Sequence, residues 1–473
     1  MSWETVIGLE VHAQLATRTK LFCGCAAEFG AAPNTNVCPV CLGLPGALPV
    51  TNRRAIHLAA LASKAIGATV HTQSIFARKN YFYPDLPKGY QITQFDSPLA
   101  TGGTLDINSP ERGPVAIGIT RLHVEEDAGK LIHDRFPEHT AVDLNRAGVP
   151  LAEIVSEPDL RSPGEARVFL TELRRILEYA AVSDCNMEEG HLRVDANLSI
   201  RPAGSHQLGT KQEVKNMNSF AAAERALEQL RDLQIAAAEQ NEPILPYTYS
   251  AATGTLHVMR TKEESHDYRY FPDPDLPPLV LDPSWLASLA EALPELPVAR
   301  RERLVEQYAI TRDQAWVLTA RRDLADYYQS AVDAGGSPSA VAHWVMGPVL
   351  QDANENAGEF RVTPARLAEL IGLVGSDAVS NQAAKKVFAA MAANDDAPRD
   401  VAERLELLQV GDDGQLDQWI ADVLERFPDE LARLRAGEDK LLGFFMGQVM
   451  ELSKGRADPK KVSARFMSKV GEL

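Results

Sequence analysis

The stretch I-G-L-E-V-H-A-Q-L, residues 7–15, decides what kind of fold this chain can form. Its apolar and polar residues alternate, which is the pattern of a β-strand with one buried face. Such a strand would present Glu10, His12 and Gln14 together on its other face. An acid and an imidazole two residues apart can share a cation, but half-buried strands also carry charged outer faces that bind nothing. The stretch predicts a strand and leaves both interpretations of its polar face open.

Segments of the same kind dominate the chain as far as about residue 290. Residues 192–200 alternate without a break, and residues 117–126 and 210–216 alternate less regularly. Two helices are expected among these segments, over residues 52–66 and 162–181. Many strands with few helices between them predict a large, mainly antiparallel sheet in an α+β domain.

The pattern changes to a helical period after the proline-rich residues 293–297. Residues 394–400, N-D-D-A-P-R-D, have the composition of a short linker. We therefore expect a sheet domain over residues 1–293, a helical domain over 294–398 and a small helical tail domain over 399–473. Four residues are expected to be N-caps of helices: Thr311, Thr363, Ser380 and Asp400.

Length, composition and charge limit the class of protein. The 473 residues are 45% hydrophobic, which is enough for about three globular domains. The chain has no apolar run long enough to span a membrane, and its first residues lack the features of a signal peptide. We therefore expect a cytoplasmic protein. The 65 acidic and 48 basic residues give a net charge of −17, which argues against a protein that binds nucleic acid over its whole surface.

Cysteine spacing predicts a metal site. Cys23 and Cys25 form C-G-C, and Cys38 and Cys41 form C-P-V-C-L-G, whereas Cys185 stands apart. Two tight turns can place four thiolates around one Zn²⁺. Such an ion would have no open position, so we expect it to be structural. The first spacing is tighter than usual, which leaves a redox role open.

Two later segments supply further carboxylates. In R-L-H-V-E-E-D-A-G-K, residues 121–130, an extended chain places Glu125 on the face of His123. The next acids, Glu126 and Asp127, are expected to cap the turn that follows. Glu125 is therefore the residue of this segment that is expected to face the polar side of the first strand.

A second acidic segment, L-A-E-I-V-S-E-P-D, spans residues 151–159. The candidate metal ligands and catalytic residues are then Glu10, His12, Glu125 and Glu153. Several carboxylates facing one cavity repel one another unless a cation compensates them. Mg²⁺ commonly combines one or two carboxylates with water and substrate phosphates, which suits nucleotide phosphoryl transfer. The imidazole ligand leaves Mn²⁺ possible.

A nucleotide would need further contacts, because the chain has no phosphate-binding glycine loop. For each basic candidate a solvated surface charge is at least as good an interpretation. The candidate contacts are Lys79, Arg193, Asp195, Lys211 and Arg269.

The last residues are the one basic stretch of the chain. Residues 453–471 contain six basic residues and one acidic residue. A nucleic-acid backbone could bind there. Solvated helix ends have the same composition.

Five motifs closely resemble the B subunits of the glutamyl/aspartyl-tRNA amidotransferases, the GatB family. They are G-L-E-V-H, R-K-N-Y-F-Y-P-D-L-P-K-G-Y-Q-I, R-L-H-V-E-E-D-A-G-K, D-L-N-R-A-G-V-P-L-A-E-I-V-S-E-P-D and D-Y-R-Y-F-P-D-P-D-L. The resemblance covers nearly the whole chain in the same order. It implies an N-terminal cradle with a glutamine-synthetase-like antiparallel fold, then a helical domain and a tail domain that contacts tRNA.

The resemblance also implies a reaction. The side-chain carboxylate of Glu-tRNA(Gln) or Asp-tRNA(Asn) would be phosphorylated by ATP and then amidated by ammonia. An amidase A subunit would supply the ammonia, and a small C subunit would complete a heterotrimer. The family's metal ligands carry over to Glu10, His12, Glu125 and Glu153, whereas the four cysteines occur in only some members.

Two other functions remain open at this point: a carboxylate–amine ligase that works alone with free ammonia, and a zinc-bearing tRNA adaptor without catalysis. The choice between Glu-tRNA and Asp-tRNA is also open, as are the ammonia route and the subunit interface.

Overall fold

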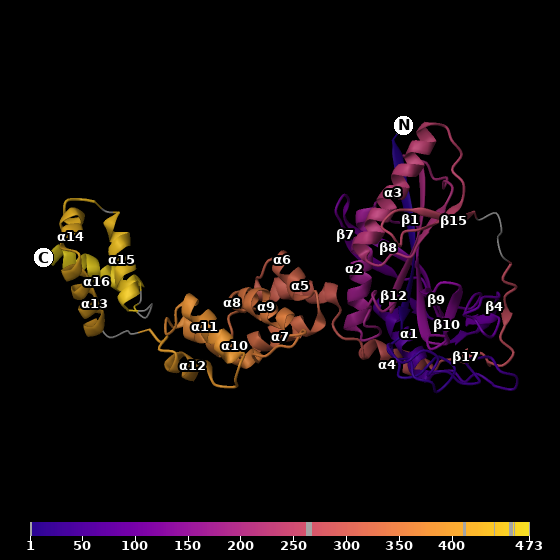
Figure 1. The fold of residues 1–473 in the computed structure, drawn as a ribbon, viewed down its shortest axis with the longest axis horizontal. Coiled ribbons are helices and arrows are strands. Elements are labelled where there is room, and N and C mark those ends of the chain that lie inside the picture. The colour runs from indigo at the N-terminus through magenta and orange to yellow at the C-terminus, as the bar shows by residue number, and fades with distance from the viewer. Residues whose placement is uncertain are drawn as a thin grey trace. The chain divides into compact units, whose positions relative to one another are not determined.

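The computed structural model describes residues 2–261, 267–409, 413–438, 440–453, 457 and 459–472. It divides into two compact units, residues 1–297 and 298–473 (Figure 1). The domain boundaries expected at residues 293 and 398 stay predictions. None of the helices in the described part of the chain has both the length and the apolarity that crossing a bilayer requires.

The first unit is built on a ten-stranded sheet, in which β13 and β14 are the only parallel pair among the described strands. The sheet has the order β15-β14-β13-β12-β1-β11-β8-β6-β2, with β7 paired to β8. The strands are β1 (Trp3–Gln14), β2 (Thr69–Val70), β6 (Ala100–Thr101), β7 (Thr104–Ser109), β8 (Gly113–Glu126), β11 (Pro150–Ser156), β12 (Leu192–Pro202), β13 (Gln212–Lys215), β14 (Tyr247–Ser250) and β15 (His257–Thr261). The expected α+β class with a large, mainly antiparallel sheet is confirmed.

Strand β1 lies between β11 and β12, and its two faces differ as the alternation predicts. Ile7, Leu9 and Val11 are buried. They belong to one core that includes residues of helices α1, α2 and α3, and α2 and α3 run along the sheet in Figure 1. The helices are α1 (Arg53–Ala65), α2 (Pro163–Tyr179) and α3 (Phe220–Glu239). Because the helices cover one face of the sheet, the polar side chains of β1 lie on the other.

Two of the helices in this unit are not expected from the sequence, namely α3 and α4 (Pro283–Glu291). The buried face of α3 contains Ala222, Ala223 and Ala226, with Leu227. Alanine gives a weak apolar signal although it is the best helix former, so the period of α3 is hard to see in the sequence.

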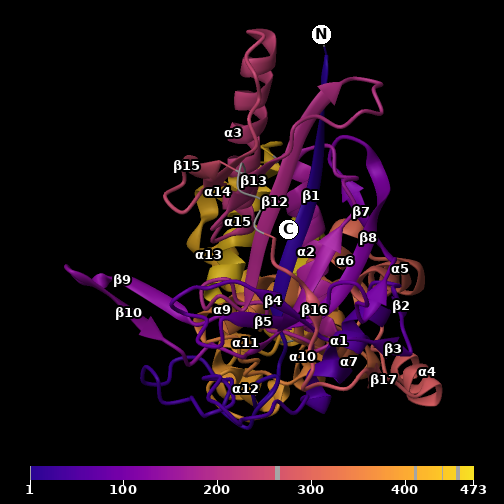
Figure 2. The same cartoon turned by 90° about the vertical axis from the view of Figure 1, so that its right-hand side faces the viewer.

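Three small sheets lie beside the large one. Strands β4 (Ala77–Asn80), β5 (Tyr90–Thr93) and β16 (Phe271–Pro272) form a three-stranded sheet, so the segment near residue 270 lies beside residues 77–80. Figure 2 shows the hairpin of β9 (Lys130–Phe136) and β10 (His139–Asp143) projecting from the unit. Strand β17 (Leu279–Val280) pairs with β3 (Gln73–Ser74).

The second unit is helical and has two separate cores. The first core is formed by α5 (Pro297–Tyr308), α6 (Arg312–Leu318), α7 (Arg322–Asp333), α8 (Pro338–Trp344), α10 (Pro364–Gly375), α11 (Asn381–Met391) and α12 (Pro398–Arg404), with a π-helical turn (Val345–Val349) that leads into α9 (Leu350–Glu355). The second core joins α13 (Asp413–Arg426), α14 (Pro428–Arg435), α15 (Leu441–Leu452) and α16 (Pro459–Glu472).

Helix starts in this unit agree with most of the expected caps. Three N-caps are confirmed, and their side chains accept backbone hydrogen bonds: Thr311, Thr363 and Ser380. Asp400 was the wrong residue, since Ala397 is the N-cap and Asp400 lies in the first turn of α12. The linker interpretation of residues 394–400 is wrong for its last part, because α12 begins at Pro398 and buries Val401 in the first core.

The start of α2 is fixed by a fully buried carboxylate. Glu165 accepts hydrogen bonds from the Ser109 hydroxyl (2.6 Å), the Arg112 guanidinium (2.6 Å) and the backbone N–H of Arg161 (2.6 Å). Burial opposes the charged form, but the hydrogen bonds from Arg112 and Ser109 outweigh it and lower the pKa of Glu165. The charged carboxylate therefore stabilises the contact between α2 and β7.

Replacing Glu165 with Ala should lower the free energy of unfolding by about 3–5 kcal/mol, because three donors lose a buried charged acceptor. The folded-state pKa lies below the unfolded one. The contribution is therefore complete above the unfolded pKa of about 4.3 and is lost as the pH falls through the folded pKa. Urea unfolding at pH 7 and in acid measures both effects. Glu228→Ala, on the exposed face of α3, is the control, and equal losses in the two variants would contradict the prediction.

Candidate functional site

The polar face of β1 meets polar residues of its neighbours through strand register. His12 lies opposite Glu153 of β11. The His12 Nε2 atom is 3.2 Å from Glu153 Oε2 and 3.5 Å from Glu125 Oε1. One ligand atom from each of these three residues lies within 4.8 Å of the others. This donor set could hold a metal ion, and its two carboxylates and imidazole suit a divalent cation.

His123 also belongs to this group, although the sequence motifs did not select it as a ligand or catalytic residue. Its Nε2 atom is 3.4 Å from Glu153 Oε2 and 3.7 Å from Glu125 Oε2. It is buried and lies opposite Glu153 on β8. The signal that could have found it is its placement two residues before Glu125, on the same face of the strand.

The two imidazoles and two carboxylates stabilise one another's charges. Burial opposes protonation of both imidazoles, but the nearby carboxylates outweigh it, raising the pKa of His12 and raising that of His123 to about 9. Burial likewise opposes ionisation of Glu125 and Glu153, but the imidazoles outweigh it and lower both pKa values. The imidazoles therefore favour the ionised carboxylates, and the carboxylates favour the protonated imidazoles.

Glu10 falls into a second group, although it was expected to join the first. It lies opposite Asp195 of β12, and one ligand atom from each of Glu10, Asp195 and Glu213 lies within 4.8 Å of the others. Lys215 forms ion pairs with Asp195 at 2.5 Å and with Glu213 at 3.2 Å. The structure thus brings the four predicted ligands onto one sheet face but divides them between two groups.

The basic residues predicted to contact a nucleotide differ in their exposure and in their partners. Arg193 is paired with Asp127, at 2.8 Å. Lys211 is exposed and precedes β13, so Lys215 is the lysine of that segment that reaches the acids. Arg269 is exposed, whereas Lys79 lies over the ring of Tyr268 with its Nζ 4.8 Å from the centroid.

Glu126 and Asp127 do not cap a turn as expected, because both are buried. The Glu126 carboxylate accepts a hydrogen bond from the backbone N–H of Ile92 at 2.8 Å and forms an ion pair with Lys88. Asp127 is bound by Arg193, as described above, and by Arg146. The expectation failed because β8 continues through Glu126, and the following acid meets arginines of other segments.

The four clustered cysteines converge on one point. Their sulfurs lie within 4.8 Å of one another, and those of Cys38 and Cys41 are 3.9 Å apart. A tetrahedral zinc site with bonds of about 2.3 Å requires sulfur separations of about 3.8 Å. The backbone N–H of Cys38 donates to Cys41 Sγ at 3.1 Å, and Gly43 closes the turn with a φ of +68°, in the left-handed region that favours glycine. This cluster could hold a metal ion.

Lys20 supplies a buried positive charge beside the cysteines. It is fully buried, and its ammonium donates to Cys41 Sγ at 3.6 Å and to two backbone carbonyl groups, those of Asn36 and Leu144. A hydrogen bond from Cys23, helped by Lys20 and opposed by burial, lowers the pKa of Cys41 to about 4. Lys20 therefore favours the thiolate form that binds metals.

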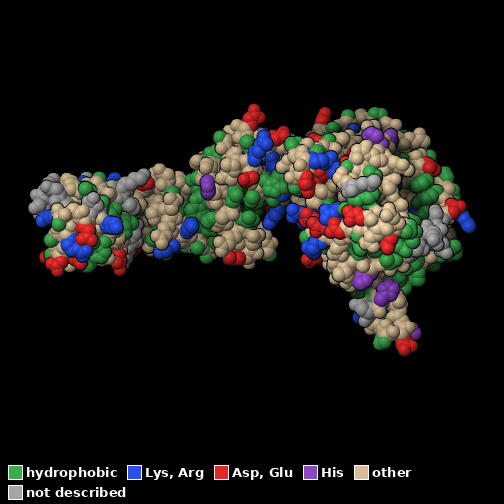
Figure 3. Space-filling view, turned by 90° about the horizontal axis from the view of Figure 1, so that it is seen from above, with side chains coloured by type: hydrophobic (Ala, Val, Ile, Leu, Met, Phe, Trp, Pro, Cys, Tyr) green, Lys and Arg blue, Asp and Glu red, His purple; other side chains and the backbone are tan. Residues whose placement is uncertain are grey.

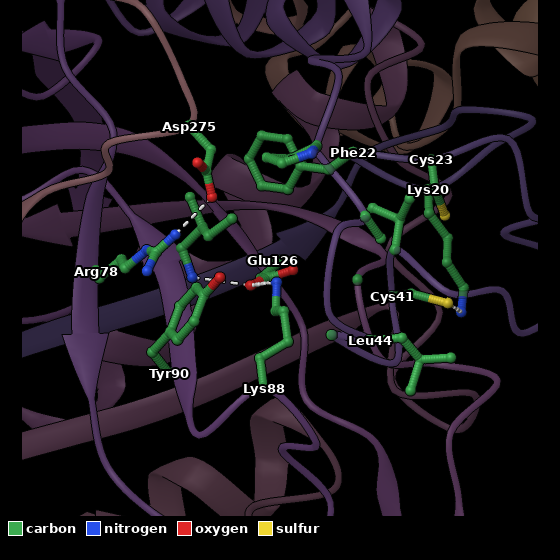
Figure 4. A pocket seen from close by; sticks show the side chains of 16 residues that line it. Lys20, Phe22, Cys23, Cys41, Leu44, Arg78, Lys88, Tyr90, Glu126 and Asp275 are labelled. Atoms are coloured by element: carbon green, nitrogen blue, oxygen red, sulfur yellow. Dashed lines mark hydrogen bonds and ion pairs between the residues drawn. The ribbon is translucent and has the colours of Figure 1, made fainter.

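A cavity of about 240 Å³ separates the cysteines from the three-stranded sheet (Figure 4). Lys20 and Cys41 line one side of it, and Arg78 and Asp275 line the other. Its lining contains two ion pairs, Arg78–Asp275 and Lys88–Glu126, so the cavity is polar.

The basic stretch near the C-terminus is partly neutralised. Arg465 and Lys469 of α16 form ion pairs with Asp417 of α13, at 2.8 Å and 3.7 Å. Figure 3 shows basic and acidic side chains beside one another on these C-terminal helices. Two other cations of the stretch and its acid lie outside the described residues: Lys454, Arg456 and Asp458.

Replacing Lys20 with Met should weaken metal binding by the cysteine cluster about 10- to 100-fold, because the side chain keeps its bulk but loses the charge that favours thiolates. Competition with a chromophoric chelator measures this affinity. The control is Lys130→Met on the exposed part of β9, which should bind metal like the unmodified chain. An unchanged affinity in the Lys20 variant, with unaltered thermal unfolding, would exclude this role.

Comparison with known proteins assigns the family. Residues 5–287 match the family described as the GatB/GatE catalytic domain, and residues 326–470 match the GatB domain. The B subunit of the aspartyl/glutamyl-tRNA(Asn/Gln) amidotransferase from Oleidesulfovibrio alaskensis is 48% identical over 474 residues, covering 99% of each chain.

Relatives of the same description from Geotalea daltonii and Caldanaerobacter subterraneus are 48% and 46% identical. The first alignment covers 99% of this chain and 100% of the relative, and the second covers 97% and 98%. These matches extend over both units of the structure. The chain belongs to the GatB family, the B subunits of the aspartyl/glutamyl-tRNA(Asn/Gln) amidotransferases.

Proposed function

We propose that this chain phosphorylates the side-chain carboxylate of Glu-tRNA(Gln), Asp-tRNA(Asn) or both with ATP, and then amidates it with ammonia. The products are Gln-tRNA(Gln) and Asn-tRNA(Asn). The complex is an ATP-dependent carbon–nitrogen ligase that takes its amide nitrogen from glutamine. The observation that carries the proposal is the convergence of His12, Glu125 and Glu153 on one sheet face of a GatB-family chain.

The two steps follow from the chemistry of the carboxylate. A free carboxylate offers ammonia no usable leaving group. Attack of its oxygen on the γ-phosphorus of ATP forms a P–O bond and releases ADP. Ammonia then attacks the carbonyl carbon of the acyl phosphate, the C–O bond to phosphate breaks, and the nitrogen loses a proton. Inorganic phosphate and the amide remain.

The acids have the role of binding the metal that accompanies the nucleotide. Glu125, Glu153 and His12 would hold one Mg²⁺ or Mn²⁺ ion, and Glu10 with Asp195 would hold or orient a second cationic group. A bound divalent cation supplies charge neutralisation between carboxylates and phosphates. Lys215 pairs with Asp195 and Glu213 of the second group, and it would exchange these partners for phosphate.

The four basic candidates have different proposed roles because their surroundings differ. Lys79 has aromatic contacts but no carboxylate within ion-pair distance in the described part of the chain, which favours phosphate binding. Arg193 is proposed to contact phosphate through its partly exposed guanidinium while it remains paired with Asp127. Lys211 and Arg269 are exposed, and we propose them as contacts of the larger tRNA substrate or of the nucleotide.

A structural Zn²⁺ in the four-cysteine cluster is part of the proposal. All four ligands come from the chain, so the ion would stabilise the loops that carry them and take no part in catalysis. One wall of the cavity in Figure 4 is formed by these loops. Loss of the ion is therefore expected to disturb the shape of that cavity first.

The proposed partners are an amidase A subunit that releases ammonia from glutamine, and a small C subunit, in a cytoplasmic heterotrimer. The relatives are each described as one subunit of an amidotransferase, which supports an assembly. The acceptor end of tRNA would enter the cradle, residues 1–293, and another part of the tRNA would bind the basic tail. The proposed tail contact uses the basic stretch of residues 453–471, of which Arg465 and Lys469 pair with Asp417.

Replacing Glu125 with Gln should abolish tRNA-dependent ATP cleavage, because the side chain keeps its shape but loses the charge that pairs with His12 and His123. Glutamine hydrolysis by the assembled complex should continue. Phosphate release with and without misacylated tRNA measures the first activity. Glu157→Gln, an exposed residue that accepts a hydrogen bond from Thr120, is the matched control. ATP cleavage at the original rate in Glu125→Gln would exclude the site.

Removing the tail should weaken tRNA binding more than ATP binding. The chain should end at residue 409 rather than at residue 400, since Val401 and Ala402 are part of the first core of the helical unit. Tail cations contribute salt-sensitive affinity for phosphates, so the loss should be larger at low salt. Filter binding of tRNA and equilibrium binding of ATP measure the two affinities. Equal losses would contradict a separate tRNA-binding role.

A further inference from the structure

Four aromatic side chains form a continuous row beside the three-stranded sheet; we call it the ring row. Tyr81 meets Tyr268 edge to face at 6.1 Å, and Tyr268 meets Tyr270 in the same way at 6.0 Å. Tyr270 and Phe95 then stack in parallel, with centroids 4.0 Å apart and planes inclined by 3°. The row joins three chain segments that are distant in sequence.

Backbone contacts hold the row in place. The Asn80 N–H donates to the Tyr268 carbonyl at 2.9 Å, and the Asn80 side chain donates to the Arg269 carbonyl at 2.8 Å. Arg78 forms an ion pair with the buried Asp273, also at 2.8 Å. These contacts hold the segment on both sides of Tyr270 against β4.

The ring row lies beside the acids of the first group. Thr93, two residues before Phe95, donates to Glu125 Oε2 at 3.2 Å. Burial, and after it the charge of Glu125, raises the pKa of Tyr81 and of Tyr270. Both phenols therefore stay neutral at physiological pH, and the row offers uncharged ring faces next to carboxylates.

Phe95 is the ring whose exposure needs an explanation. It is 47% exposed, although its partner Tyr270 is half-buried. Single exposed aromatic residues are common and need no special reason. Here the exposed ring ends a fixed row that also holds the Lys79 ammonium, whose Nζ lies 5.8 Å from the centroid of Tyr81. A flat aromatic surface beside a cation suits a base attached to a phosphate.

We propose that the ring row is a purine-binding subsite, in which the base stacks on the Phe95–Tyr270 pair. The inference rests on the proposed function, which brings two purines to this face of the sheet: the adenine of ATP and the terminal adenosine of the tRNA. Both groups are adenine bases, and the row would bind one of them. Either base can stack on an aromatic side chain, so kinetic measurements must show which of the two binds here.

The test uses the assembled amidotransferase with Phe95→Leu, which removes the ring but keeps an apolar side chain. The KM for ATP is measured at saturating misacylated tRNA, and the KM for that tRNA at saturating ATP. One of the two should rise by about fivefold to 150-fold, the range that loss of one base–aromatic stack gives. A rise for ATP identifies its adenine as the occupant, and a rise for tRNA identifies the terminal adenosine.

Two further variants separate stacking from structure. Phe95→Trp keeps a ring and should keep both KM values near those of the unmodified enzyme, whereas Tyr270→Leu removes the supporting ring and should reproduce the Phe95→Leu effect. Phe136→Leu is the matched control, since Phe136 has the same 47% exposure on the β9 strand. It should change neither KM.

The inference is overturned if both KM values of Phe95→Leu and Tyr270→Leu stay within about twofold of those of Phe136→Leu while the unmodified complex cleaves ATP. A rise in Phe95→Trp equal to that in Phe95→Leu would also overturn it. Absence of tRNA-dependent ATP cleavage in the unmodified complex is a different result, because it refutes the proposed function and the subsite with it.

Discussion

Charge compensation on the polar face of β1 is the constraint on which the rest of the site depends. Glu125 and Glu153 lie close enough to repel each other, and burial increases that repulsion. His12 and His123 contact both carboxylates and favour their ionised forms. The proposed cation would meet carboxylates that are already ionised, and its binding would displace protons from the imidazoles.

Antiparallel register places these charges without any special loop. Strands β8, β11, β1 and β12 lie side by side, so residues at matching positions become cross-strand neighbours. The helices α1, α2 and α3 bury the opposite face of the same sheet. The apolar half of each strand therefore stabilises the fold, and the polar half is free to carry charge. The ring row borders this face from segments outside the large sheet.

Alternation along the strands predicted which side chains share a face, and for β1 and β12 that prediction is confirmed. Alternation could not show which strands are neighbours. Glu10 and His12 fall into different groups because the acid opposite Glu10 is on β12, whereas the acid opposite His12 is on β11. Glu126 was misplaced because its partner Lys88 is distant in sequence. The aromatic residues of the ring row lie in separate segments of the sequence, and the pairing of β16 with β4 brings their rings together.

The claim that one sheet face binds a divalent cation beside a nucleotide has a direct measurement. Crystals of the complex grown with ADP and Mn²⁺ would locate the ion by its anomalous scattering. The account predicts a peak within coordination distance of both Glu125 and Glu153, with His12 directed at it. A peak bound elsewhere, with these three side chains in contact only with one another, would contradict the account.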